Sequence, residues 1–227
     1  MEHLFSKYDF KSDLILSNLS EEEEGIVNSS MEWIPFKKGK MLFYEDGIPT
    51  GVFLITKGKA KIYKTGMDGK EQIFYIYREG DLLGYHALLC NERYEDSCES
   101  LEPCETKFIS AKKFNQLLDK IPSLRLSLIQ NMSHEFGVMV NTITLLAQKS
   151  LKVRFALYLL VLDTRYNNNG INLSREDFAN IIGTTRESLG KLIKEFREDS
   201  LIAVDKRIIS ILNREGLFEL TKSSYAE

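Results

Sequence analysis

The feature that most constrains the fold is a change in hydrophobic period along the chain. From residue 31 to about residue 110, apolar and polar side chains alternate, as they do in the run GVFLITKGKAKIYKTGMDGKEQIFYIYREGDLLG. A period of two is typical of β-strands, and glycines that recur about every ten residues are typical of the turns between short strands. These glycines are Gly39, Gly47, Gly58, Gly69 and Gly80. This part of the chain is therefore predicted to form a β-sandwich or β-roll.

A second pattern begins after Pro122, where the spacing of apolar residues becomes helical for about thirty residues. Two sets of apolar side chains each repeat every seven residues, and together they fill the a and d positions of successive heptads. They are Ile129, Met132, Phe136, Met139, Ile143 and Leu146. A seam this regular favours a helix that pairs with its copy in a dimer. The alternative is a helix that packs its stripe against the β-domain of its own chain.

Two short amphipathic helices are predicted further on, in the stretch SREDFANIIGTTRESLGKLI that begins at Ser174. Ser174 suits the N-cap of the first helix, and Gly183 permits a tight turn after it. Thr184 or Thr185 suits the cap of the second helix. The run LIAVDKRIISIL then predicts two short strands. The order indicates a helix–turn–helix followed by a hairpin.

Polar residues near the start of the second helix are candidates for contact with DNA bases. Arg186, Glu187 and Lys191 lie off the apolar stripe of that helix. Arg and Lys can bind O6 and N7 of guanine, and Glu can accept a hydrogen bond from N4 of cytosine, when the first turn enters the major groove. The alternative is structural: Glu187 completes a capping box with Thr184, and Arg186 is a solvated charge.

Overall charge and common motifs narrow the function classes. The net charge is −3, and the stretch from Lys152 to the end has 12 Lys and Arg against 11 Asp and Glu, so charge alone does not indicate DNA binding. No nucleophile elbow, zinc-protease motif or P-loop is present, so no enzyme is expected. The longest apolar run, residues 155–162, is too short to span a membrane, and the first residues do not resemble a secretory signal. A cytoplasmic protein without a membrane partner is predicted.

The cysteines do not form a recognisable site. Cys90, Cys98 and Cys104 are odd in number, and no pair has C-x-x-C spacing. The simplest interpretation is that they are small buried apolar side chains, and the alternative is a redox sensor. An iron–sulfur cluster is not predicted, because it needs about four thiolates.

A β-roll, a long dimer helix, a helix–turn–helix and a hairpin in this order resemble the Crp/Fnr family of bacterial transcription regulators. The resemblance covers residues 34–220 approximately and is most specific in FLITKGKAKIYKTGMDGKEQI, in EGDLLG and in LSREDFANIIGTTRESLGKLIKEFREDSLI. It implies an α+β fold with a cyclic-nucleotide-binding-type sensor β-roll (jelly roll) in residues 1–120. A dimerisation helix would follow in residues 121–150 and a winged helix–turn–helix DNA-binding domain in residues 151–227.

The resemblance also implies partners and contacts. The protein is expected to be a homodimer that binds an inverted repeat in double-stranded DNA and acts with RNA polymerase. Arg186, Glu187 and Lys191 are expected to read bases. Relatives with cAMP-receptor specificity usually carry Arg where Lys191 stands, and Lys cannot make the planar bidentate contact, so the resemblance does not fix the base preference there. The expected phosphate contacts are Arg175, Thr184, Thr185 and Ser188.

An effector pocket is implied in the β-roll, but its residues differ from those of cyclic-nucleotide-binding members. Such members carry Glu directly after the glycine of GDLLG and an Arg-Ser pair that holds the phosphate; here Tyr85 and the pair Glu95-Asp96 occupy these positions. Like charges ~4 Å apart repel by about 4 kcal/mol at an effective dielectric constant of about 20. The effector is therefore predicted not to be cAMP. The expected pocket residues are Gly84, Tyr85, His86, Arg93, Glu95 and Asp96.

Two alternatives to this interpretation remain open. His86 is similar in position to the haem-binding histidine of carbon-monoxide-sensing members, so a haem or redox sensor on the same scaffold is possible, although Gly84 stands where those members carry a cysteine ligand. No other cofactor is expected. The second alternative is a cyclic-nucleotide-type regulatory subunit of another protein, and the hairpin and the candidate base-reading residues argue against it.

Overall fold

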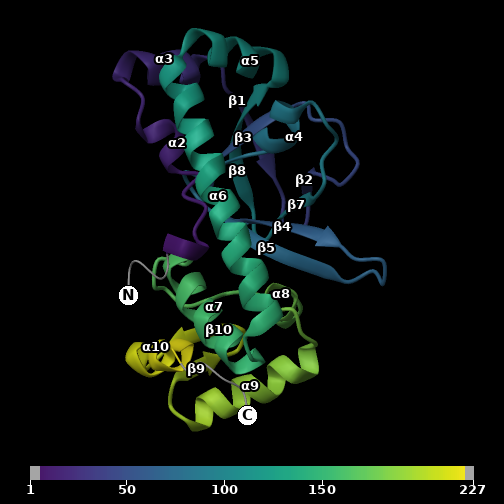
Figure 1. Cartoon of the computed structure of the whole chain (residues 1–227), viewed down its shortest axis with the longest axis vertical. Helices are drawn as coiled ribbons and strands as arrows, with labels where there is room; N and C mark the ends of the chain where they lie inside the picture. Colours follow the sequence, from purple (N-terminus) through teal and green to yellow (C-terminus); the bar gives the residue numbers. More distant parts are fainter. Residues whose placement is uncertain (1–5, 223–227) are drawn as a thin grey trace. The chain divides into compact units, whose positions relative to one another are not determined.

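The computed structural model describes residues 6–222 (Figure 1). Within them the chain divides into two compact units, an N-terminal unit of Phe10–Phe136 and a C-terminal unit that joins residues 6–9 to residues 137–222. The division falls inside the long helix, whereas the sequence pattern predicts that this helix is a segment of its own. It also groups residues 6–9 with the C-terminal part of the chain instead of with the β-roll.

Two antiparallel four-stranded sheets form the body of the N-terminal unit. One sheet has the strand order β1–β8–β3–β6, with bounds Glu32–Phe36, Cys104–Ser110, Gly51–Lys57 and Leu82–Leu83. The other has the order β2–β7–β4–β5, with bounds Met41–Phe43, Ser97–Ser100, Ala60–Thr65 and Glu71–Tyr77. Many neighbouring strands are far apart in sequence, as in jelly rolls. The predicted β-sandwich is confirmed.

Helices pack against the first of these sheets and complete the core of the N-terminal unit (Figure 1). They are α2 (Leu14–Ser17), α3 (Glu21–Ser29), α4 (Tyr85–Cys90), α5 (Ala111–Lys120) and the first half of α6 (Pro122–Gln148). Val52, Leu82 and Ile109 of the sheet belong to one buried cluster with Phe114 of α5 and Leu124 of α6. Burial of this apolar surface is the main force that holds the helices on the sheet. It also fixes the position of α4, which lines the pocket described below.

The α6 helix has one exposed apolar face. Side chains that are 47–72% exposed lie on it, and they are Leu126, Ile129, Phe136, Val140 and Ile143. Their spacing of three, four or seven residues puts them on one stripe of a helix. Of the predicted seam, Ile129, Phe136 and Ile143 belong to this stripe, whereas Met132, Met139 and Leu146 are partly buried. The exposed stripe therefore includes Leu126 and Val140, which the predicted seam lacks, and excludes Met132, Met139 and Leu146.

The C-terminal unit contains the predicted pair of short helices and the hairpin. Its elements are the end of α6, then α7 (Leu151–Arg165), α8 (Arg175–Ile182), α9 (Arg186–Glu198), β9 (Ile202–Asp205), β10 (Ile208–Ile211) and α10 (Arg214–Lys222). The aromatic rings of Phe155, Phe178 and Phe196 pack together in its core and are fully buried. Gly183 ends α8 with φ +65°, a left-handed conformation in which a side chain would be strained. The predicted helix–turn–helix with a hairpin wing is confirmed.

Residues 6–9 pack on the C-terminal unit although they are distant from it in sequence. The carboxylate of Asp9 forms an ion pair with Arg165 near the end of α7, and the side chain of Arg165 is only 3% exposed. The backbone carbonyl of Lys7 accepts a hydrogen bond of 3.2 Å from Nδ2 of Asn141 in α6. This short segment, which includes the 3-10 turn Ser6–Tyr8, is thus attached by side chains from two helices of the unit.

Candidate functional site

The second helix of the pair, α9, presents the predicted base-reading residues to solvent. Thr185 caps α9, and its hydroxyl accepts a hydrogen bond of 3.2 Å from the backbone N–H of Ser188. The first turn of α9 is therefore firmly capped. The inner side of the helix is buried through Leu189, Leu192, Ile193 and Phe196.

Arg186, Glu187 and Lys191 are all exposed on this packed helix. The capping-box alternative for Glu187 is wrong, because Thr185 and not Thr184 is the cap and Ser188 stands at the position that a capping-box glutamate would occupy. Backbone and hydroxyl hydrogen bonds at the helix start lower the pKa of Glu187, so its carboxylate is a hydrogen-bond acceptor at neutral pH. The geometry leaves all three side chains available to a DNA groove.

Arg175, at the start of α8, has unused hydrogen-bonding capacity. Its Nη1 is buried and has no hydrogen-bond partner among the described residues. Burial, and after it the charge of Arg207, lowers the pKa of the Arg175 guanidinium. An anion placed between these two arginines would satisfy both, which supports a phosphate contact at this point. Arg207 was not among the predicted contacts, and the only sequence signal for it is a basic residue in the turn between β9 and β10.

The other predicted phosphate contacts lie at the start of α9. Thr184 and Ser188 are partly buried, and Thr185 is exposed. The hydroxyl of Thr185 already serves as the cap and also lies 3.3 Å from the hydroxyl of Ser188. These residues thus lie where a helix N-terminus favours a phosphate.

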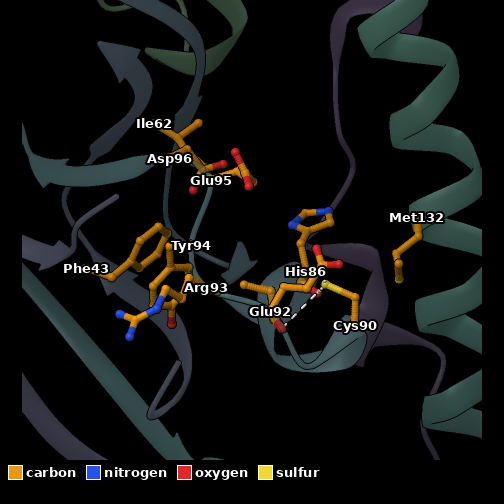
Figure 2. Close-up of a pocket in the computed structure, with 12 residues that line it drawn as sticks. Phe43, Ile62, His86, Cys90, Glu92, Arg93, Tyr94, Glu95, Asp96 and Met132 are labelled. Carbon is orange, nitrogen blue, oxygen red and sulfur yellow. Dashed lines mark hydrogen bonds between the residues drawn. The ribbon is translucent and has the colours of Figure 1, made fainter. Parts of the chain in front are cut away.

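A cavity of about 240 Å³ lies in the N-terminal unit at the predicted effector position (Figure 2). Its lining residues are Phe43, Ile62, Gly84, His86, Ala87, Cys90, Glu92, Arg93, Tyr94, Glu95, Asp96 and Met132. The prediction that Tyr85 belongs to this pocket is wrong: its side chain is fully buried in the core cluster behind α4. Met132, predicted as part of the dimer seam, instead lines the cavity. The apolar lining residues were missed because no local pattern connects β2, β4 and α6.

The charges around this cavity are largely neutralised or directed elsewhere. Nη1 of Arg93 donates a hydrogen bond of 2.5 Å to the backbone carbonyl of Asp46, and Figure 2 shows its guanidinium directed away from His86. Lys64 pairs with Glu95 at 3.1 Å and with Glu45 at 2.7 Å. The guanidinium of Arg93 is thus already engaged with the protein itself. Of these two cations, Lys64 is paired with carboxylates, and Arg93 is directed away from His86 toward the backbone of Asp46.

Asp96 differs from the other charged residues that line the cavity. It is partly buried, and it makes no hydrogen bond or ion pair within residues 6–222. Loss of hydration raises the pKa of this carboxyl group to about 6, and the nearby charges of His86 and Lys64 act in the opposite direction. The pocket therefore contains one carboxylate that no described side chain contacts by a hydrogen bond or an ion pair.

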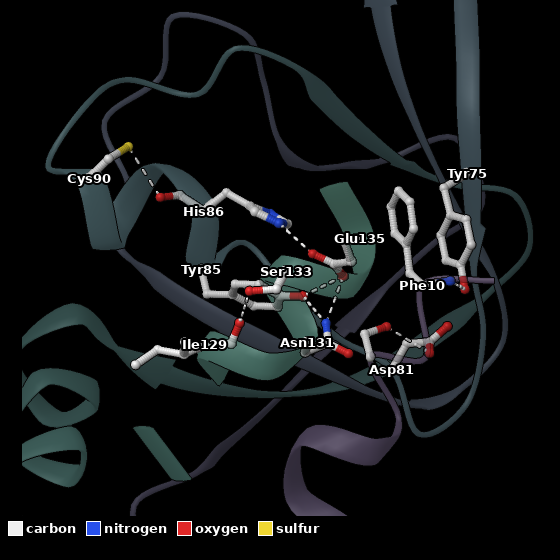
Figure 3. Close-up of polar contacts among 11 residues, drawn as sticks. Phe10, Tyr75, Asp81, Tyr85, His86, Cys90, Ile129, Asn131, Ser133 and Glu135 are labelled. Carbon is white, nitrogen blue, oxygen red and sulfur yellow. Dashed lines mark hydrogen bonds and ion pairs between the residues drawn. The ribbon is translucent and has the colours of Figure 1, made fainter. Parts of the chain in front are cut away.

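A buried polar network connects α4 to α6 beside the cavity (Figure 3). Glu135 of α6 accepts hydrogen bonds of 2.7 Å from the hydroxyl of Tyr85 and 2.9 Å from Nδ2 of Asn131, and its Oε2 lies 2.6 Å from Nε2 of His86. The side chain of Glu135 is only 4% exposed. Burial, followed by the charge of Glu135, raises the pKa of Tyr85 well above its usual value, so the phenol remains protonated as a donor. The network supplies hydrogen-bond partners to the carboxylate of Glu135, because burial of a carboxylate without such partners would cost free energy.

The haem and redox alternatives lose support from these contacts. Nε2 of His86 is bound to Glu135, and the cavity of about 240 Å³ is smaller than typical small-molecule sites of roughly 300–1,000 Å³. Burial raises the pKa of Cys98 and raises that of Cys104 to about 11, and burial also raises the pKa of the exposed Cys90, so none of the thiols is activated as a thiolate.

In the part of the chain that the structure describes, no three His, Cys, Asp or Glu side chains gather as a metal site. Among the helices of residues 6–222, none has the length and apolar content to cross a membrane.

Known proteins share both parts of this architecture. The cyclic nucleotide-binding domain family matches residues 33–121, and the Crp-like helix-turn-helix domain family matches residues 153–220. The fumarate and nitrate reduction regulatory protein of Vibrio cholerae is 29% identical over 193 residues, which cover 82% of this chain and 77% of the relative. The structure of FixK2 from Bradyrhizobium japonicum has a TM-score of 0.78 at 20% identity and covers 86% of this chain and 99% of that chain. A Crp-family transcriptional regulator from Thermus thermophilus has a TM-score of 0.71 at 19% identity, with coverages of 84% and 97%.

The two matched domains define a DNA-binding transcription regulator with an effector-sensing domain. The chain belongs to the Crp/Fnr family. Members of this family regulate transcription and are not enzymes, which agrees with the expectation from the sequence.

Proposed function

We propose that the protein is a homodimer that recognises an inverted repeat in double-stranded DNA and responds to a small-molecule effector other than cAMP. The observation that carries the DNA part is the exposure of Arg186, Glu187 and Lys191 on a helix whose opposite side is packed and whose first turn is capped. In this proposal residues 1–120 sense the effector, 121–150 dimerise and 151–227 bind DNA. RNA polymerase as a partner and the cytoplasm as location belong to the same proposal and are supported by the family's role in transcription.

The exposed stripe of α6 supports the homodimer. A contiguous exposed apolar face on one helix is unusual for a monomer and is typical of an interface. Its spacing of three and four residues matches the contact positions of a two-stranded coiled coil. A two-fold dimer would present two copies of α9 to half-sites about one helical turn, ~34–36 Å, apart.

The first test of the DNA part is the substitution Arg186→Ala. It is expected to weaken binding to the cognate half-site by about 1–3 kcal/mol and to relax the preference at one base pair, because the guanidinium reads a base edge. Selection of binding sites from random DNA should first return an inverted repeat, whose affinity is then measured with both proteins. If no inverted repeat is recovered, or if the variant loses affinity equally for all sequences, α9 does not read sequence.

Arg175→Ala provides the matched comparison in the same experiment. Because Arg175 is proposed to contact a phosphate, its loss should weaken binding to all sequences alike and reduce the salt slope of binding by about one. The selected sequence should remain the same as for the unmodified protein. A changed base preference in this variant would contradict the phosphate role.

A separate prediction concerns cAMP. Calorimetry on the unmodified protein is expected to show no binding at micromolar cAMP, because Glu95 and Asp96 line the cavity at the positions that the resemblance assigns to the phosphate-binding Arg-Ser pair, and Arg93 is directed to Asp46. Repulsion of about 4 kcal/mol corresponds to roughly a thousandfold in affinity. The double variant Glu95→Arg, Asp96→Ser restores the pair that the cyclic-nucleotide-binding members carry, so it should bind cAMP more tightly. Micromolar binding by the unmodified protein would contradict this prediction.

A further inference from the structure

The cavity of the N-terminal unit combines a free carboxylate with an apolar surface. Asp96 is the lining carboxylate without a partner among the described residues, whereas Glu95 is paired with Lys64. Glu92 is exposed and lies 3.5 Å from the thiol of Cys90. Arg93 is engaged with the backbone of Asp46. Close to Asp96, an anionic group would therefore meet repulsion, and a cationic group would find a partner.

The apolar part of the lining is formed by side chains from β2, β4, α6 and the loop before β7. The rings of Phe43 and Tyr94 stack with their centroids 4.1 Å apart, and Ile62 of β4 and Met132 of α6 also line the cavity. Aromatic rings and the methionine thioether offer good contacts to a flat or irregular apolar body. The volume of about 240 Å³ restricts the ligand to a small molecule.

We infer that this pocket binds a small organic cation, an amine whose ammonium group pairs with Asp96 and whose apolar body packs against Phe43, Tyr94 and Met132. The inference rests on the proposed function, because it names the chemical class of the effector. The occupant reaches α6 directly through Met132 and indirectly through His86, which is bound to Glu135 of that helix. Binding of the amine would therefore act on the helix that carries the exposed apolar stripe.

The same pairing predicts the pH dependence of binding. Asp96 is affected by His86 of α4, Lys64 of β4, its neighbour Glu95, and Glu45 after β2, and its pKa in the free protein is about 6. The carboxylate must be ionised to pair with an ammonium group. Affinity should therefore be greatest above pH 6 and fall by up to about tenfold for each pH unit below it.

The experiment uses the full chain and benzylamine as the probe ligand. Benzyl alcohol is the neutral control ligand, and benzoate is the anionic control ligand. Calorimetry at pH 7.5 is expected to show that benzylamine binds at least tenfold more tightly than either control ligand, and this preference should be lost at pH 5. Asp96→Asn, which keeps the shape of the side chain, should abolish the preference. Glu79→Gln, which removes an exposed carboxylate outside the cavity lining, should leave it intact.

The inference is overturned if benzoate binds as tightly as benzylamine, or if Asp96→Asn does not change the preference. An equal loss in both variants would also overturn it, because general acidity and not Asp96 would then be the cause. If Asp96→Asn fails to fold, an NMR titration of the Asp96 carboxyl group in the unmodified protein takes its place. Benzylamine should lower the pKa of that group, and an unchanged titration curve contradicts the pairing.

DNA binding by the same preparation separates this inference from the proposed function. Binding to an inverted repeat without a benzylamine preference would overturn the assignment of the pocket and leave the DNA function in place. A benzylamine preference that depends on Asp96, without any sequence-specific DNA binding, would support the pocket and contradict the proposed function.

Discussion

The double substitution Phe136→Glu, Ile143→Glu is expected to give monomers that bind the inverted repeat about 100-fold more weakly, because the two copies of α9 are then no longer linked in one dimer that occupies both half-sites. These side chains are 72% and 61% exposed, so the substitutions should not disturb the core of either unit. In a dimer seam, however, they would place four carboxylates in an apolar interface, where unpaired charges are strongly unfavourable. Sedimentation equilibrium measures the oligomeric state, and titration of the selected DNA measures the affinity.

The control for this prediction introduces the same charge on another part of the helix surface. Gln130→Glu with Gln148→Glu adds two carboxylates at exposed positions of α6 outside the stripe. This variant should remain dimeric and bind DNA normally. A Phe136→Glu, Ile143→Glu protein that sediments as a dimer would show that the exposed stripe is not the dimer seam.

The second large effect is expected from Glu135→Ala, which should lower the free energy of unfolding of the N-terminal unit by about 2–4 kcal/mol. The substitution removes the acceptor for the buried groups of Tyr85 and Asn131 and the partner of His86. Urea unfolding can be followed by tryptophan fluorescence, because the single tryptophan, Trp33, lies in β1 of this unit. The signal therefore reports the unit that contains Glu135.

Two variants sharpen this test. Glu135→Gln keeps an acceptor oxygen for Tyr85 and Asn131 but loses the carboxylate oxygen that contacts His86, so its effect should lie between those of the alanine variant and the unmodified protein. Glu92→Ala removes an exposed carboxylate and should change the free energy of unfolding by no more than about 0.5 kcal/mol. If Glu135→Ala is no more destabilised than Glu92→Ala, the network does not stabilise the fold.

The elements that the sequence predicts well are those specified by local patterns. Alternation with glycine turns predicts the sandwich, and a Ser174 cap, a Gly183 turn and a two-strand run predict the winged helix–turn–helix. In these cases each residue acts on neighbours within about one turn or one hairpin, so the physical cause is visible in the sequence.

The features that the sequence does not predict depend on contacts between distant segments. Periodicity places Ile129 and Met132 on similar faces of α6, but only the packing of the N-terminal unit shows that Ile129 is exposed and Met132 lines the cavity. Tyr85 was assigned to the pocket by its position after Gly84, although it turns toward Glu135, fifty residues further along the chain. Sequence spacing carries no information on such pairings until the fold brings the segments together.

The attachment of residues 6–9 to the C-terminal unit makes the N-terminal unit an insertion within the chain of the DNA-binding unit. The polypeptide passes between the units twice, after Asp9 and after Phe136. A fragment that begins at residue 151 would therefore keep the helix–turn–helix but lose both the turn of residues 6–8 and the carboxylate that faces Arg165. Separating the units by a single cut leaves one of them without a part of its own structure. Transplanting this DNA-binding unit onto another sensor would thus require two junctions, with the new domain placed between residues 9 and 137.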